Sequence, residues 1–190
     1  MLRVFECYAG YGGCSFALRK ANINHKVVGY SEIKPSAIKL YEQNHKDLIN
    51  YGDITKIDPK NLPNFDLISG GFPCQDVSIA GRRDLTKGRT DTIWDMLNII
   101  KVKKPKYILL ENVKGIISMQ KGEYLQSILR EIKALGYTIS YKLVNSLDYG
   151  IPQNRERVYF CCELNREAFG FNPFPKKEEL NLFLKDILQE

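Results

Sequence analysis

The chain has 190 residues, of which 44% are hydrophobic and 11% aromatic, so it can bury the core of one domain, and its formal net charge of +6 suits an anionic partner without identifying one. No stretch approaches the roughly 20 apolar residues of a membrane-spanning helix, and the first residues already read as a strand, so we expect a cytoplasmic protein with no cleaved signal. Five cysteines without a CxxC pair and only two histidines give neither a zinc pattern nor a disulfide framework, so we expect free thiols and no metal.

Strands and helices alternate along the chain. Apolar runs bounded by turn residues predict strands over 2–8, 27–31, 49–52 (a weaker one), 65–69, 106–111, 137–146 and 156–162. Apolar residues at helical spacing predict helices over 13–21, 35–45, 91–102, 122–135 and 178–188. This alternation predicts an α/β fold with a doubly wound, mostly parallel sheet. We place one domain over 1–175 and a C-terminal helix over 176–190.

A glycine-rich turn, Tyr8-Ala-Gly-Tyr-Gly-Gly13, follows the first strand and opens the first helix. It has neither the Gly-Lys-Ser/Thr of a phosphate loop nor the G-x-G-x-x-G spacing of a dinucleotide site. Gly10 and Gly12 would let the backbone approach a ligand closely, while the Glu6 carboxylate and the Tyr8 ring suit a cationic, adenine-bearing cofactor.

Acidic residues end the next two predicted strands. Glu32 follows the second strand, where nucleotide-type folds place an acid on ribose hydroxyls, and Asp53 follows the weak strand, where it could accept from an adenine amine. Each acid alone is more often a surface charge or a helix cap. Beside the glycine-rich turn, acids at successive strand ends fit S-adenosylmethionine as the cofactor.

Cys74 lies in Ile68-Ser-Gly-Gly-Phe-Pro-Cys-Gln75, on a turn directly after a predicted strand. Reactive groups in open α/β sheets gather beyond the carboxyl ends of strands, so we interpret Cys74 as a nucleophile. The alternative is a buried structural cysteine, but a core thiol has no need of Gly70, Gly71 and Pro73 to bend the backbone around it.

A basic stretch follows the proposed nucleophile. Its cationic residues fall within eight positions of one another and are Arg82, Arg83, Lys87 and Arg89. Beside a reactive thiol, such a stretch is typical of a loop that clamps the phosphate backbone of a nucleic acid. The alternative is a solvated loop, which is what most charge runs are.

Three more charged residues complete the candidate site. Glu111 follows the apolar run 107–110, so its carboxyl group is expected at the same sheet edge as Cys74. Arg155 and Arg157 precede the last predicted strand, and side chains two residues apart point to one side of an extended chain. Taken alone, the arginines could equally be a surface pair.

Together these segments resemble the cytosine-5 DNA methyltransferases. Gly-Phe-Pro-Cys-Gln75, Glu111-Asn-Val and Gln153-Asn-Arg-Glu-Arg157 stand in the family's order behind the glycine-rich turn, and the resemblance covers residues 2 to about 188. It implies a Rossmann-like S-adenosylmethionine-dependent methyltransferase fold, with 1–175 as the catalytic and cofactor-binding domain.

The resemblance also implies the role of each residue. The Cys74 thiolate would add to C6 of a flipped-out cytosine while Glu111 contacts N3. Arg157, with Arg155, would organise the site and contact the base carbonyl O2. The cofactor would be held by Tyr8, Gly10, Gly12, Glu32 and Asp53. Double-stranded DNA would be contacted by Gln75, Ser78, Arg82, Arg83, Lys87 and Arg89.

The chain also departs from the family's pattern. The family more often shows Asp-Leu-Phe where this chain has Glu6-Cys-Tyr8, and Asp76 near the thiol disfavours its thiolate. Family members continue into a target-recognition domain. We therefore expect either a split enzyme, in which a second polypeptide supplies this domain and a helix that closes the cofactor pocket, or a truncated gene product. The alternatives are a tRNA cytosine-5 methyltransferase and a non-catalytic relative that binds DNA or cofactor.

Overall fold

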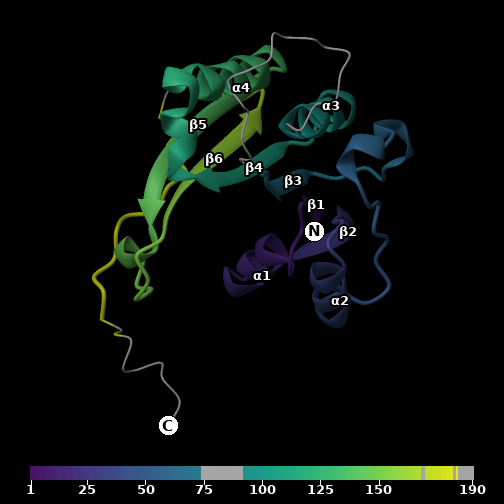
Figure 1. Ribbon diagram of the computed structural model, residues 1–190, viewed down its shortest axis with the longest axis horizontal. Helices are drawn as coiled ribbons and strands as arrows, with labels where there is room; N and C mark the ends of the chain where they lie inside the picture. The colour runs from purple at the N-terminus through teal and green to yellow at the C-terminus, as the bar shows by residue number, and fades with distance from the viewer. Residues whose placement is uncertain (74–91, 168–169, 182, 184–190) are drawn as a thin grey trace.

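The computed structural model describes residues 1–73, 92–167, 170–181 and 183. Six strands form one sheet in the order β2-β1-β3-β4-β6-β5 (Figure 1). The strands are β1 (Leu2–Cys7), β2 (His25–Ser31), β3 (Leu67–Gly71), β4 (Tyr107–Val113), β5 (Tyr137–Asn145) and β6 (Glu156–Leu164). The pairs β1–β2, β1–β3 and β3–β4 are parallel, whereas β6 runs antiparallel to β4 and β5. The predicted α/β fold with a mostly parallel sheet is confirmed.

Helices cover both faces of the sheet. Figure 1 shows two of them, α1 (Gly13–Lys20) and α2 (Pro35–Asn44), on one face, and α3 (Ile93–Lys103) and α4 (Glu123–Ala134) on the other. Single 3₁₀ turns lie between these elements: η1 (Ile54–Lys56), η2 (Pro59–Asn61), η3 (Lys114–Ile117), η4 (Met119–Gly122) and η5 (Ser146–Asp148). Among the described residues, no helix is long and apolar enough to cross a membrane.

The main core lies between the sheet and the α3–α4 layer. Helix α4 forms because its apolar side chains recur every three or four residues, and all of them are buried: Tyr124, Leu125, Ile128, Leu129 and Ile132. Alternate residues of β4 and β6 meet this layer and are buried, namely Ile108, Leu110, Val158, Phe160 and Cys162. The intervening residues of the two strands face the other side of the sheet, where most are only half-buried.

Three sequence-based boundaries need correction. The weak strand over 49–52 does not form, and Asn50 makes only an isolated bridge with Tyr30. Strand β3 begins two residues later than predicted and includes Gly70 and Gly71. The helix expected over 178–188 is absent from the part of it that the structure describes, residues 178–181 and 183.

Candidate active site

The carboxyl ends of β3 and β4 bring Glu111 against the chain that leads to Cys74. Gly71, the last residue of β3, pairs directly with Glu111 of β4. A Cβ atom on Gly71 would lie only 2.9 Å from Glu111 Oε2, so the absence of a side chain lets the carboxylate lie over the backbone. This contact is three residues before Cys74, which itself lies outside the described residues.

Strand β6 brings Arg157 to the same place from the opposite direction. Its Nε atom lies 2.9 Å from Glu111 Oε1, and both side chains are about three-quarters buried, with 23% and 29% of their surface exposed. Arg157 Nη1 also donates a 2.7 Å hydrogen bond to the main-chain oxygen of Glu156. The ion pair and the hydrogen bond use Nε and Nη1, and no partner of Nη2 is found among the described residues.

Arg155 lies just before β6 and is exposed, but its side chain lines the same cavity as Arg157. This cavity, of about 350 Å³, lies on the open face of β4, β6 and β5. Main-chain bonds hold the segment in place, because Arg155 N donates to Asn145 Oδ1 and its carbonyl accepts from Ser146 N. The expectation that the two arginines point to one side agrees with this placement.

Asn112 is a contributor that the sequence reasoning did not single out. Its side-chain amide donates a 2.9 Å hydrogen bond to the main-chain oxygen of Phe72, and the residue is 2% exposed. The bond ties the strand that carries Glu111 to the turn that precedes Cys74. The signal was present in the Glu-Asn-Val sequence, where a polar residue sits at a position whose strand neighbours face the core.

The glycine-rich turn closes against Glu32, directly after β2. Gly10 has a φ of +57°, and its N–H donates a 2.9 Å hydrogen bond to Glu32 Oε2. Glu32 Oε1 accepts from the N–H groups of Ile33 and Lys34, both at 2.8 Å, just before α2 begins. Both carboxylate oxygens therefore have partners, and Oε2, which accepts only one of these bonds, retains a lone pair for a further donor.

Asn50 links Glu32 to the segment that carries Asp53. Its side-chain oxygen accepts from the N–H groups of Glu32 and Gly52, and its amide donates to the carbonyl of Glu32. Asp53 then caps η1, because Oδ1 accepts from the main chain and the hydroxyl of Thr55, and these bonds lower the pKa of its carboxyl group. Asp53 thus follows a bridged loop rather than the strand that the sequence predicted.

Glu6 does not face a ligand, contrary to expectation. It is 2% exposed, and its carboxylate accepts from the N–H of Ser15 in the first turn of α1 and from the Tyr41 hydroxyl. Burial raises the pKa of Glu6, whereas the two hydrogen bonds oppose that rise. The acid therefore stabilises the start of α1 beneath the glycine-rich turn.

Tyr8 connects the glycine-rich turn to α3. Its hydroxyl lies 2.8 Å from the carbonyl oxygen and 2.9 Å from the hydroxyl oxygen of Thr92, which caps α3. The ring is half-buried between the two segments, and the residue has a φ of +51°.

The four described cysteines are free but lack the character of a nucleophile. Burial raises the pKa of Cys14 to about 11 and that of Cys161 to about 11. Burial also raises the pKa of Cys7 and Cys162. A reactive cysteine needs an accessible thiolate, and these four sites disfavour it. The remaining cysteine, Cys74, lies outside the described residues, as do Gln75, Ser78, Arg82, Arg83, Lys87 and Arg89.

Comparison with known protein families matches residues 2–190 to the family described as C-5 cytosine-specific DNA methylase. The chain belongs to this family. A type II methyltransferase of Lactococcus lactis subsp. cremoris, M2.ScrFI, is 35% identical, and the alignment covers 100% of this chain and 68% of the relative. The type II methyltransferase M.NlaIV of Neisseria lactamica is 40% identical, and the alignment covers 99% of this chain and 46% of the relative. For M.HhaI of Haemophilus parahaemolyticus the identity is 38%, with 98% and 57% covered.

Solved structures of methyltransferases share the fold. The Dnmt2 methyltransferase of S. pombe superposes with a TM-score of 0.75 at 30% identity, covering 94% of this chain and 57% of that one. The Entamoeba histolytica methyltransferase EhMeth gives a TM-score of 0.74 at 22% identity, a likeness of fold alone, with 95% and 57% covered. This chain spans about half of the length of most of these relatives. The matches are to longer single chains and give no support to the expected second polypeptide.

Proposed function

We propose that this protein is an S-adenosylmethionine-dependent DNA (cytosine-5)-methyltransferase. The observation that carries the proposal is the convergence of Glu111 and Arg157 beside Gly71. Their 2.9 Å ion pair lies at the carboxyl end of the parallel sheet. Gly71, which pairs with Glu111, precedes Cys74 by three residues in the sequence. An acid, a guanidinium and a thiol are the three groups that activation of C5 of cytosine requires.

The residues around the glycine-rich turn fit S-adenosylmethionine. Gly10 and Gly12 both have positive φ, and a Cβ atom on Gly10 would meet no atom closer than 4.0 Å, so the backbone there is open to the close approach of a ligand. The hydrogen bonds from Gly10 to Glu32, and through Asn50 to Gly52, hold two carboxylates beyond the ends of β1 and β2. Glu32 would accept from the ribose hydroxyls and Asp53 from the adenine amine. When bound, S-adenosylmethionine supplies an electrophilic methyl group.

The chain's own residues would activate the base in a charge-balanced sequence. The Cys74 thiolate forms a bond to C6, and the electrons of the C5–C6 double bond move into the ring. Glu111 would donate a proton to N3, and Arg157 would donate a hydrogen bond to O2 through Nη2, so the negative charge that builds on the N3–C2–O2 edge is neutralised. C5 would then form a bond to the methyl group as the bond between this group and the sulfonium sulfur breaks. A base removes the C5 proton, and the C6–sulfur bond breaks to release the thiolate and the aromatic product. The N3 proton would return to Glu111 when the thiolate leaves.

The DNA-binding part of the proposal rests on the basic stretch that follows Cys74. Arg82, Arg83, Lys87 and Arg89 would contact phosphates of double-stranded DNA, with Gln75 and Ser78 near the flipped base. Arg155 lines the same cavity as Arg157 and would support its position. A protein that modifies DNA in this way would act in the cytoplasm of a cell without a nucleus.

The test is covalent trapping on DNA that carries 5-fluorocytosine. Fluorine at C5 blocks the final elimination, so the wild-type chain with S-adenosylmethionine should form a protein–DNA complex that survives denaturant. Cys74→Ala should abolish it. Cys161→Ala is the matched control, because this thiol lies on the open sheet face near Arg157 and should leave trapping unchanged.

Trapping by Cys74→Ala would refute the assignment of the nucleophile. The same assay on tRNA that carries 5-fluorocytosine decides the class of substrate, because a complex with tRNA and none with DNA would replace the proposal by the tRNA-directed alternative. No complex with either nucleic acid would favour a non-catalytic relative. Tritiated methyl transfer to the unmodified nucleic acid should follow the same order.

A further inference from the structure

A basic hollow lies at the opposite edge of the sheet from the candidate active site. It has a volume of about 620 Å³ and is formed by the end of α1, the start of β2 and the chain after α2. Its cationic or ionisable side chains are Arg19, His25, Lys26, His45 and Lys46. Asp and Glu are absent from its lining, so one sign of charge dominates its surface.

The cations of this hollow are not neutralised by neighbouring acids. Among the ion pairs of the described residues, none includes Arg19, Lys26 or Lys46. All three side chains are exposed at the rim. Uncompensated like charges that converge on one concave surface raise the local concentration of anions.

A second basic hollow nearby shows the contrast. It is lined by Arg3, Lys103, Lys104 and Lys106, but also by Asp66, which forms a 2.8 Å ion pair with Arg3. Lys103 Nζ donates to the carbonyl oxygen of Leu62. Arg3 and Lys103 of this second hollow therefore already bind oxygen atoms of the protein. Arg19, Lys26 and Lys46 of the α1–β2 hollow form no ion pair among the described residues.

The floor of the α1–β2 hollow adds hydrogen-bond donors that suit an oxyanion. Asn22 and Asn24 line it, and the Ser15 hydroxyl lies 3.2 Å from His25 Nε2. Burial lowers the pKa of His45, and the nearby positive charges of Arg19 and His25 lower it further. Ser15 is itself tied to the buried Glu6, whose carboxylate accepts from Ser15 N and from the Tyr41 hydroxyl. Asp47 lies between Lys46 and Leu48 in the sequence, but it is not part of the lining and forms no ion pair among the described residues.

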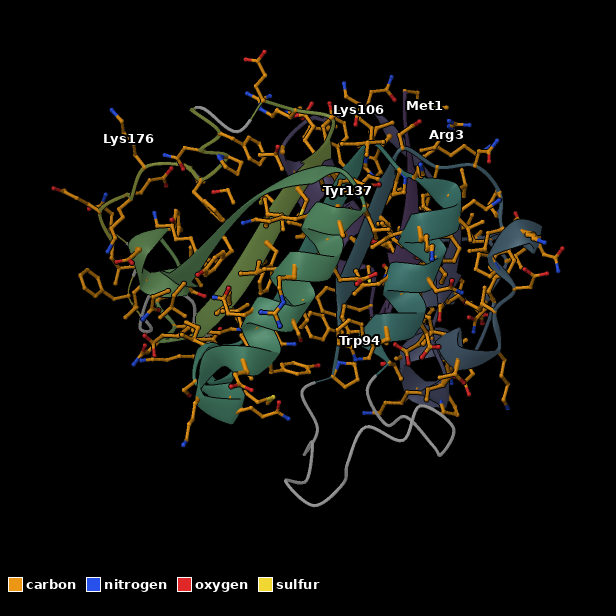
Figure 2. The ribbon with its side chains drawn as sticks, turned by 90° about the horizontal axis from the view of Figure 1, so that it is seen from above. Met1, Arg3, Trp94, Lys106, Tyr137 and Lys176 are labelled. Carbon is orange, nitrogen blue, oxygen red and sulfur yellow. The ribbon has the colours of Figure 1, made fainter. Side chains whose placement is uncertain are left out.

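The hollow is separate from the Glu111–Arg157 pair, although His45 in its lining lies against Gly12 of the glycine-rich turn. Because a strand rises about 3.3 Å per residue, the length of β2 puts His25 roughly 20 Å from Ser31, which precedes Glu32. Lys26 pairs with Arg3, and Figure 2 shows Arg3 and Lys106 along one edge of the molecule with Trp94 toward the other. A ligand in the hollow would therefore leave the carboxyl edge of the sheet free.

We propose that the hollow between α1, β2 and the end of α2 binds a phosphate group. Arg19 offers a planar fork of donors that matches phosphate oxygens, while Lys26 and Lys46 supply point charges from the other sides. The phosphate could belong to a nucleic-acid backbone or to a small phosphorylated molecule. This inference does not depend on the proposed methyl transfer and fails or stands separately from it.

The first arm of the test is a titration of the 190-residue chain with inorganic phosphate at constant ionic strength, followed by ¹H–¹⁵N NMR. Saturable shifts are expected at the amides of Asn22, Lys26 and Lys46. The triple variant Arg19→Gln/Lys26→Gln/Lys46→Gln should bind at least tenfold more weakly. Its matched control has the same loss of charge on exposed residues elsewhere, Lys39→Gln/Lys101→Gln/Lys133→Gln, and should keep its affinity within about twofold.

Shifts that rise linearly with phosphate, or an equal loss in both triple variants, would overturn the site, because either result reflects net charge alone. The second arm measures binding of a fluorescent DNA duplex as a function of salt. If the hollow holds backbone phosphate, its triple variant should reduce the slope of log affinity against log salt by about one to three, and the control should not. An unchanged slope with saturable phosphate binding identifies a small phosphorylated ligand. Single Lys26→Gln, at an exposed position, repeats both arms if the triple variant does not fold.

Discussion

The imidazole of His45 lies so close beneath Gly12 that a Cβ atom added to Gly12 would be 2.6 Å from His45 Nε2. Gly12 also has a φ of +87°, a backbone angle that residues other than glycine rarely adopt. His45 Nε2 is buried and has no hydrogen-bond partner among the described residues, so packing rather than bonding holds it there. Two independent constraints thus demand glycine at the N-cap of α1.

We predict that Gly12→Ala lowers the free energy of unfolding by roughly 2 kcal/mol or more, because it adds a steric contact to backbone strain. Gly52→Ala separates the two causes, since Gly52 has a φ of +68° but nothing within 4 Å of an added Cβ. Urea denaturation should show a smaller loss for Gly52→Ala. In a His45→Ala background the cost of Gly12→Ala should fall. Equal costs at Gly12 and Gly52 would contradict the steric argument.

Removal of Arg157 should slow methyl transfer with little effect on the fold. If its guanidinium stabilises charge on the base, Arg157→Ala should lower the single-turnover rate about a hundredfold to a thousandfold. Arg166→Ala is the control, because Arg166 also forms a 2.9 Å ion pair with a glutamate, but at an exposed position outside the site. A rate for Arg157→Ala within a few-fold of wild type would remove it from the catalytic group.

Glu32 should govern cofactor affinity. Charged hydrogen bonds contribute roughly 1.5 to 3 kcal/mol each, so Glu32→Ala should weaken S-adenosylmethionine about tenfold to a hundredfold in titration calorimetry. The variant also leaves Gly10 N without its acceptor, which loosens the turn. Glu131→Ala, on the exposed side of α4, should bind as the wild type does. Unchanged affinity in Glu32→Ala would exclude Glu32 from the cofactor site.

The Arg3–Asp66 pair should make stability depend on pH in the acid range. Hydrogen bonds from Arg3 lower the pKa of Asp66 from 3.8 to about 2. A carboxyl group whose pKa is lower in the folded state stabilises the fold above its unfolded value, and this contribution is lost as pH falls through the folded value. Urea titrations should therefore show the difference between wild type and Asp66→Asn shrinking as pH falls from about 3.8 to about 2. A difference that stays constant over this range would contradict the linkage.

The sequence predicted most of the architecture because its local signals agree with the packing. The apolar run at the start of β4 and the helical spacing in α4 both lie in elements that pack into the core. The antiparallel direction of β6 was not predicted, although only residues 146–155 connect it to β5. A parallel crossover needs a dozen or more residues and usually a helix, so this short connection was a readable signal.

The errors have physical causes in side-chain bonding and in strand position. The 49–52 strand fails because the Asn50 side chain takes the N–H groups of Glu32 and Gly52, which a ladder would otherwise use. Strand β3 extends through Gly70 and Gly71 because β1 and β4 flank it and supply partners that outweigh the weak strand preference of glycine. Glu6 was wrongly expected to face the cofactor. In the sequence, an acid at the end of a strand has the same pattern whether its carboxylate contacts a ligand or, as here, the start of a helix.

The pairing of β6 with β4 links the direction of the Arg157 side chain to the packing of the hydrophobic core. Side chains alternate between the faces of a strand, so a slip of one residue in register would turn Arg157 toward α4 and expel Val158 and Phe160 into solvent. Both apolar side chains are fully buried, and their exposure would cost roughly 1.5 to 3 kcal/mol each. The register that buries Val158 and Phe160 is therefore the same one that places the Arg157 guanidinium beside Glu111. Selection for a stable core thus also maintains the alignment of the site.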